Sequence, residues 1–177
     1  QAIVDRIAKA ASESSYPDYE MSLEDLTSYT AIERDPVCGP YRQIKVCGMG
    51  PPSSGGIATL QILGMLEPFD LQELGPNNPK AIHLLAEASR RAFADRAIYL
   101  ADPDQVDVPI AGLIEPNYLK SRSAGIDSQS VVASYVQPGA PAGADVDRWA
   151  PSPSESGRST THLSVVDSQG NAVALTS

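Results

Sequence analysis

The stretch NPKAIHLLAEASRRAFADRAIYL, residues 78–100, decides the fold because it carries the features of one long helix from end to end. Asn78 precedes Pro79, which is typical of a helix that begins with a side-chain cap and has proline in its first turn. Apolar side chains recur at helical spacing along the stretch and predict one buried stripe. That stripe consists of Ile82, Leu85, Ala88, Ala92 and Phe93.

Charged residues on the same helix follow one another at intervals of four. Glu87 with Arg91, and Arg91 with Asp95, are spaced for ion pairs between neighbouring turns. Because charged side chains mostly face water, we predict a solvated face for them. His83 belongs to the same helix, and we predict that its side chain is structural or exposed.

Shorter elements precede and follow the long helix. Helical spacing predicts further helices over 3–11, 23–29, 57–66, 109–113 and 115–125. Ser22 and Asp25 match a capping box for the second of these. Pro51-Pro52 and Gly55-Gly56 predict irregular backbone before residue 57, with glycines that let another backbone come close.

The two cysteines lie in two predicted strands, 37–41 and 44–48. If Arg42-Gln43 forms the loop of a hairpin, Cys38 lies directly opposite Cys47, and a disulfide is possible. Arg-Gln is a poor two-residue turn, and a cross-strand bridge demands particular geometry. Two packed thiols are therefore favoured over the disulfide.

Composition excludes several classes of partner. The 177 residues carry a formal net charge of −9, which would repel nucleic acid and anionic membranes. No apolar stretch reaches the roughly 20 residues of a membrane span.

Asp102 and Asp104 favour a turn that ends the long helix, since the ligand spacing of a calcium loop is missing. We predict no metal and no cofactor. We expect no signal peptide in this stretch. We also expect that the chain is cut at both ends, because both ends lie inside predicted elements.

A linker composition separates the helical part from a final hairpin. Residues 137–157 are rich in proline, glycine, alanine and serine, and we predict a mobile, exposed segment there. Strands are predicted over 161–166 and 172–176, with a turn between them. Thr160 stands at the junction. A threonine hydroxyl is a weak nucleophile, but if the chain breaks before it, its own new α-amine can act as the base.

Three segments resemble the gamma-glutamyltranspeptidase family in their residues, their order and their approximate spacing. They are PPSSGG (51–56), AEASRRAFADRAIYLADPD (86–104) and ESGRSTTHLSVVDSQGNAVA (155–174). The resemblance implies an N-terminal-nucleophile hydrolase with an α+β fold. This chain would be a fragment of its four-layer αββα sandwich, helix-rich with a β-hairpin at the C-terminal end.

The resemblance also implies a site. A precursor of this family cuts itself into a large and a small subunit, and the nucleophile is the first threonine of a Thr-Thr-His run, which falls on Thr160. Ser159–Thr160 is then the cleaved bond. Residues 1–159 would be the later part of the large subunit, and residues 160–177 would begin the small subunit.

The implied reaction moves the gamma-glutamyl group of glutathione, or of another gamma-glutamyl compound, to water or an amino acid acceptor through an acyl-enzyme on Thr160. The implied partners are the remainders of both subunits, and the implied location is periplasmic or extracellular. The family's substrate-binding residues and oxyanion donors fall outside this stretch, so none is assigned here.

Alternatives remain open. Cephalosporin acylases and capsule-processing transpeptidases resemble the same family and would keep the nucleophile while changing the substrate. A third interpretation is that the 177 residues alone form a non-catalytic scaffold fragment, because half of an active site cannot turn over substrate. We expect Ser159–Thr160 to stay uncut in the isolated chain.

Overall fold

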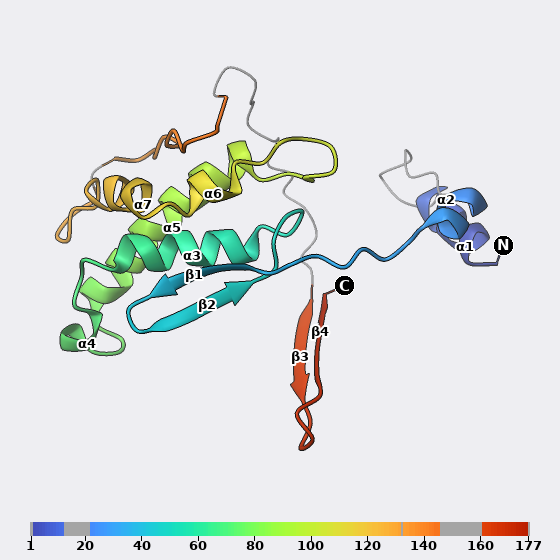
Figure 1. Ribbon diagram of the computed structural model, residues 1–177, viewed down its shortest axis with the longest axis horizontal. Coiled ribbons are helices and arrows are strands. Elements are labelled where there is room, and N and C mark those ends of the chain that lie inside the picture. Colours follow the sequence, from blue (N-terminus) through green and yellow to red (C-terminus); the bar gives the residue numbers. More distant parts are fainter. Residues whose placement is uncertain (1, 13–21, 132, 146–160, 177) are drawn as a thin grey trace. The chain divides into compact units, whose positions relative to one another are not determined.

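Figure 1 shows the computed structural model of the chain, which describes residues 2–12, 22–131, 133–145 and 161–176. The chain divides into two units, residues 1–35 and 36–177. The first unit holds α1 (Ala2–Ser12) and α2 (Leu23–Ser28). The Ser22 hydroxyl accepts from the Asp25 amide, and the Asp25 carboxylate accepts from the Ser22 amide. The predicted capping box is therefore confirmed.

The long predicted helix is α5 (Pro79–Tyr99), and its N-terminal cap is confirmed. The Asn78 side-chain oxygen accepts from the Lys80 amide at 2.9 Å. α5 packs against α3 (Gly55–Leu66), which matches the predicted helix over 57–66. Their shared apolar core consists of Met65, Leu66, Leu84, Ala88, Ala92 and Ile126.

The predicted orientation of α5 is wrong in part. Ala88 and Ala92 are buried as predicted, but Ile82, Leu85 and Phe93 are 57%, 49% and 56% exposed. The three charged residues predicted to face water are buried instead: Glu87, Arg91 and Asp95. Burying a charge costs several kcal/mol unless it is paired and hydrogen-bonded, so these residues need partners inside the molecule.

The predicted hairpin is formed by β1 (Val37–Tyr41) and β2 (Ile44–Gly48), which run antiparallel. Cys38 lies opposite Cys47, as the predicted register requires, and the two sulfur atoms are bonded. The preference for two packed thiols is therefore wrong. Figure 1 shows the hairpin along one side of α3 and α7 (Pro116–Ser123) along another, and both contact α3.

Contacts outside the hairpin explain why a poor turn sequence is tolerated. Arg42 has a φ of 53°, in the left-handed region that few residues adopt without help. Its backbone amide donates to the Glu67 carboxylate at 3.2 Å, and its guanidinium donates to the Phe69 carbonyl at 2.9 Å. These bonds come from the chain just after α3, so the turn is held by tertiary structure.

The predicted close approach at the glycines is confirmed at Gly56. A Cβ on Gly56 would lie 2.8 Å from the carbonyl carbon of Gly48, at the end of β2. No side chain fits that space without moving backbone. The irregular segment 51–54 thus joins the hairpin to α3 at a glycine-to-glycine contact.

Short helices complete the described part of the second unit. α6 (Ile110–Leu113) and α7 (Pro116–Ser123) match the predicted helices, whereas α4 (Leu71–Leu74) was not predicted. The turn after α5 is confirmed, because the Asp102 carboxylate accepts from the Asp104 amide at 3.0 Å. A second apolar cluster links α3, α5 and α6 through Ile57, Tyr99, Val108 and Leu113.

The predicted C-terminal hairpin is confirmed as β3 (His162–Val166) and β4 (Ala172–Thr176), paired antiparallel. The Asp167 carboxylate closes its turn by accepting from the amides of Gln169 and Asn171, each at 2.9 Å. Every residue of both strands is exposed. Among the described residues, no helix is both long and apolar enough to cross a membrane.

Candidate functional site

The predicted cleavage site lies outside the described residues. Ser159 and Thr160 belong to 146–160, as does most of the predicted linker 137–157. The described chain resumes at Thr161, one residue before β3 begins. The part of the predicted motif that can be placed is therefore its second half.

The histidine of the Thr-Thr-His run is held by two hydroxyl groups. His162 Nδ1 lies 2.7 Å from Thr176 Oγ1, and its Nε2 lies 3.1 Å from Ser164 Oγ. His162 pairs with Thr176 across the hairpin, and Ser164 is two residues along the same strand, so all three side chains share one face. These two contacts fix the plane of the His162 imidazole ring, next in the chain to Thr161, which follows the predicted nucleophile.

A buried carboxylate organises the helical part of the chain. Asp95 on α5 is 0% exposed and accepts from donors on three other segments. One oxygen accepts from the Tyr118 hydroxyl at 2.6 Å and the Gln61 amide at 3.1 Å. The other accepts from the Arg122 guanidinium at 2.9 Å and the Gly139 backbone amide at 2.8 Å. Asp95 therefore joins α3, α5, α7 and the segment after α7.

These contacts change the predicted pairing of Asp95. The i,i+4 pair with Arg91 was predicted, but Asp95 forms its ion pair with Arg122 of α7. Burial, and next its hydrogen bond to Asp95, raises the pKa of the Tyr118 hydroxyl well above its usual range. Tyr118 therefore remains a protonated donor to the carboxylate at neutral pH.

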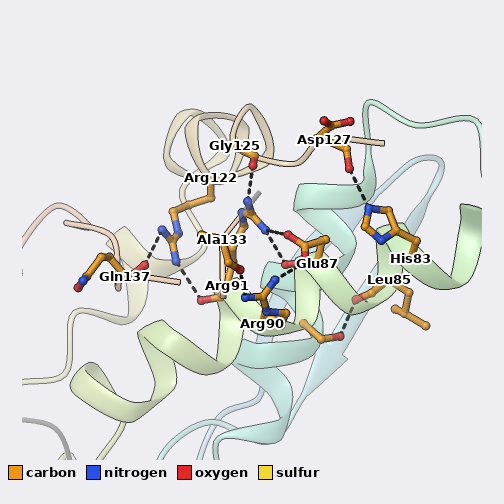
Figure 2. A network of polar contacts seen from close by, with 11 residues as sticks. His83, Leu85, Glu87, Arg90, Arg91, Arg122, Gly125, Asp127, Ala133 and Gln137 are labelled. Atoms are coloured by element: carbon orange, nitrogen blue, oxygen red, sulfur yellow. Dashed lines mark hydrogen bonds and ion pairs between the residues drawn. The ribbon is translucent and has the colours of Figure 1, made fainter. Parts of the chain in front are cut away.

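A second buried ion pair lies two turns earlier on α5, and Figure 2 shows its partners converging. Arg91 donates to the Glu87 carboxylate at 2.8 Å, so this predicted i,i+4 pair is confirmed. Arg90 also donates to Glu87, and the Arg91 guanidinium reaches the Gly125 carbonyl. The predicted solvated face therefore holds α5 to the chain after α7. We call this set of contacts among Glu87, Arg90, Arg91 and the Gly125 carbonyl the Glu87 clamp.

His83 is structural, as predicted. Its Nε2 lies 2.9 Å from the carbonyl oxygen of Asp127, and Figure 2 shows this contact beside the Glu87 clamp. The Asp127 side chain folds back on its own loop, where it accepts from the Gln129 amide at 2.8 Å. His83 thus ties α5 to the same loop after α7 that Arg91 holds at Gly125.

Acid should weaken the clamp. Burial raises the pKa of Glu87, but its hydrogen bonds to Arg91 and Arg90 outweigh burial and hold that pKa below the usual range. A carboxylate with a depressed pKa stabilises the folded protein at pH values above the ordinary glutamate pKa, about 4.3. That stabilisation is lost as the pH falls through the pKa of the carboxylate in the folded protein. We expect Glu87→Gln to lower the free energy of unfolding by about 3 kcal/mol at pH 7, and by less below pH 4. Urea unfolding at both pH values measures the difference. The exposed Glu24→Gln is the control, and equal losses at both pH values would contradict the prediction.

The first part of the predicted mobile linker is docked. We call residues 137–145 the strap. The Gly139 amide donates to Asp95, the Tyr99 hydroxyl donates to the Gly139 carbonyl at 2.6 Å, and Arg122 donates to the Gln137 carbonyl at 3.1 Å. These bonds tie the backbone of the strap to side chains of α5 and α7.

A pocket of about 470 Å³ lies between the β1–β2 hairpin, α3 and α7. Its apolar lining includes Pro40, Leu60 and Leu119, and charged Arg42, Glu67 and Lys120 also line it. The described residues of the Thr-Thr-His run do not line this pocket. No group of three or more His, Cys, Asp or Glu side chains that could hold a metal occurs within the described ranges.

Sequence reasoning missed the Asp95 network, although a signal was present. Glu87, Arg91 and Asp95 follow the same helical rows as Leu84, Ala88 and Ala92, so the charged and apolar residues share a face. Small alanines between charged residues leave room for neighbouring segments to approach. Ion-pair spacing alone predicts a solvated face, because it does not tell which side of a helix is covered.

Comparisons with known proteins agree with the motifs. The sequence model of the family described as Gamma-glutamyltranspeptidase matches residues 2–177. The Glutathione hydrolase proenzyme of Escherichia coli (strain K12) is 46% identical over 154 residues, which are 86% of this chain and 25% of that protein. The Acylase ACY 1 proenzyme of Pseudomonas sp. (strain SE83) is 40% identical over 152 residues, 86% of this chain and 25% of that protein.

A solved structure is similar as well. The crystal structure of Helicobacter pylori gamma-glutamyltranspeptidase aligns with a TM-score of 0.67 and 39% identity, over 78% of this chain and 39% of that chain. The chain therefore spans about a quarter of the length of the curated relatives named here. It shares an α+β fold with its structural neighbours over most of its own length.

Proposed function

Because this chain belongs to the gamma-glutamyltranspeptidase family, we propose that its parent protein transfers or hydrolyses the gamma-glutamyl group of glutathione and related amides. The observation that carries the proposal is the family match over residues 2–177 together with the Ser159-Thr160-Thr161-His162 run at the entry to β3. The proposed nucleophile is Thr160.

The proposed maturation is an intramolecular cleavage. The Thr160 hydroxyl oxygen attacks the carbonyl carbon of Ser159, the acyl group moves from nitrogen to oxygen, and water hydrolyses the resulting ester. The products are a new carboxylate on Ser159 and a free α-amine on Thr160. Two of the relatives named above are called proenzymes, which supports a precursor that requires processing.

The proposed turnover uses the amine that cleavage creates. The neutral α-amine, with a reference pKa near 8, takes the proton of the Thr160 hydroxyl as its oxygen attacks the gamma-carbonyl of the substrate. The amine of the leaving group departs with a proton, and an acyl-enzyme remains. Water or an amino acid then attacks the ester and restores Thr160. Backbone N–H groups elsewhere in the parent protein are the expected oxyanion donors.

The proposed organisation follows from the same cut. Residues 1–159 are the later part of the large subunit, and residues 160–177 begin the small subunit, with β3–β4 as its first hairpin. We propose that the remainders of both subunits complete a four-layer αββα sandwich around this chain. The exposed valines and leucines of the hairpin strands support this, because such strands bury their side chains in a complete sheet. The proposed location is periplasmic or extracellular.

A second candidate keeps the nucleophile and changes the substrate. The 40% identity to the acylase proenzyme favours it, since that relative covers the same share of this chain. The test is to assay the full-length protein on gamma-glutamyl-p-nitroanilide and on a glutaryl amide of the same leaving group. Preference for the gamma-glutamyl substrate supports the first proposal, and preference for the glutaryl amide supports the acylase.

A further inference from the structure

We propose that the Cys38–Cys47 disulfide is a modification site for small thiols that carry a carboxylate. The thiolate of such a compound forms a mixed disulfide with Cys38 and releases Cys47 as a thiolate. This inference does not depend on the proposed function, although glutathione, the proposed substrate, belongs to the same class of compound. Every residue of the hairpin that carries the site is described.

The disulfide lies on the exposed face of the β1–β2 hairpin. In the register of the hairpin, Cys38 pairs with Cys47, and Pro40 pairs with Lys45. Paired residues, and residues two apart on one strand, place their side chains on the same face, so these four side chains share a face. Pro40, Lys45 and Cys47 are exposed. Gly39 belongs to the opposite face, where an added Cβ would lie 3.2 Å from a side chain of α3.

An open hollow of about 460 Å³ is formed by residues of the hairpin itself, and Cys38 is part of its wall. Arg42 and Lys45 also line the hollow, and none of the described residues that line it is acidic. The Arg42 guanidinium is held by the Phe69 carbonyl. Within the described ranges no carboxylate pairs with Lys45, so its ammonium is free to bind one. A carboxylate that enters the hollow therefore meets positive charge beside Cys38.

The exchange needs no oxidant or reductant other than the thiol itself. The sulfur of the incoming thiolate attacks Cys38 Sγ and forms a new S–S bond. The bond between Cys38 and Cys47 breaks, and its electron pair stays on Cys47 Sγ as a thiolate. Lys45 precedes Cys47 by two residues on the same face, and a cation near a sulfur favours its thiolate form. Attack by Cys47 on the mixed disulfide reverses the step and restores the original bond.

Other contacts hold the hairpin when the bond opens. β1 and β2 form five residue pairs, of which the disulfide occupies one. The Arg42 amide and guanidinium are bound by groups that follow α3. Gly48 lies against Gly56 at the start of α3, where neither position has room for a side chain. The modification is therefore reversible on a folded protein.

The experiment measures thiol exchange on the full-length protein with two probes of opposite charge. The probes are 3-mercaptopropionate, which is an anion, and 2-mercaptoethylamine, which is a cation. An excess of alkylating agent stops the reaction at successive times by capturing free thiols, and peptide mass mapping locates the probe and the alkyl group. We expect the probe on Cys38 and the alkyl group on Cys47. Absence of the probe from Cys38 at every time would overturn the inference.

A charge variant tests the class of ligand. An exposed ion pair changes a rate by up to about 5-fold, so Lys45→Gln should lower the ratio of the anionic to the cationic exchange rate by about 3-fold. The ratio cancels the intrinsic reactivity of each thiol and any change in the departing Cys47 thiolate. Lys80→Gln, at an exposed position near the start of α5, is the matched control and should leave the ratio unchanged.

Two results would contradict the role of the hollow. An unchanged ratio in Lys45→Gln would show that the site does not select carboxylates. An equal fall of the ratio in Lys80→Gln would show that the overall charge of the protein, and not the hollow, sets the preference. Neither result concerns gamma-glutamyl transfer, because the assay follows only the two sulfur atoms.

Discussion

Replacement of Thr160 by alanine is expected to leave the full-length protein as a single uncut precursor with no measurable gamma-glutamyl transfer. The variant lacks the hydroxyl oxygen that attacks the Ser159 carbonyl, and it lacks the same oxygen for the acyl-enzyme. Removal of a catalytic nucleophile reduces turnover by on the order of 10⁴-fold or more. Intact mass and an assay with gamma-glutamyl-p-nitroanilide measure the two losses on one sample.

Two comparison variants make the result specific. Thr160→Ser retains an oxygen nucleophile and a potential α-amine, so it should cleave and turn over, although more slowly. Ser168→Ala removes a hydroxyl from the turn of the same hairpin, between β3 and β4, and should behave as the wild type. Normal cleavage in Thr160→Ala would show that another residue is the nucleophile, and the proposed subunit boundary would then move.

Replacement of Asp95 by alanine is expected to lower the free energy of unfolding of the full-length protein by about 3–5 kcal/mol, the range found when one partner of a buried ion pair is removed. The Arg122 side chain is 13% exposed and would keep its charge without its carboxylate. Tyr118, Gln61 and Gly139 would each lose an acceptor in the interior. Urea unfolding of the uncut precursor measures the loss.

The asparagine variant tests the electrostatic account. All four groups that contact Asp95 are donors, and in Asp95→Asn the NH₂ of the introduced amide would face donors where a carboxylate oxygen accepted. This variant should therefore cost about 2 kcal/mol or more, although it keeps the shape of the side chain. Asp107→Asn, at an exposed position, should stay within about 0.5 kcal/mol of the wild type. A wild-type unfolding midpoint for Asp95→Asn would contradict the account.

Local signals in the sequence predicted local structure well. Asn78 with Pro79, and Ser22 with Asp25, form caps between neighbours in the chain, and both caps are present. The register of the β1–β2 hairpin also followed from the sequence, because two loop residues determine which positions face each other. Each of these features depends on residues that lie close together in the chain, so the sequence pattern alone predicts it.

The errors concern features that distant segments decide. Whether Glu87, Arg91 and Asp95 face water depends on α7 and the strap, which follow α5 by more than fifteen residues. The Cys38–Cys47 bond formed although Arg42 is a poor turn residue, because the Glu67 carboxylate and the Phe69 carbonyl hold the turn. The strap has the composition of a linker, and side chains of α5 and α7 bind its backbone.

By itself, the sequence determined the helices apart from α4, the two hairpins, the family and the candidate nucleophile Thr160, because residue motifs and short-range spacing are properties of the chain. Only the tertiary structure decided which face of α5 is covered, and that the buried carboxylate of Asp95 binds donors from three other segments. The physical reason is desolvation. A charge enters the interior only where several donors converge on it, and that convergence exists only once the segments have packed together.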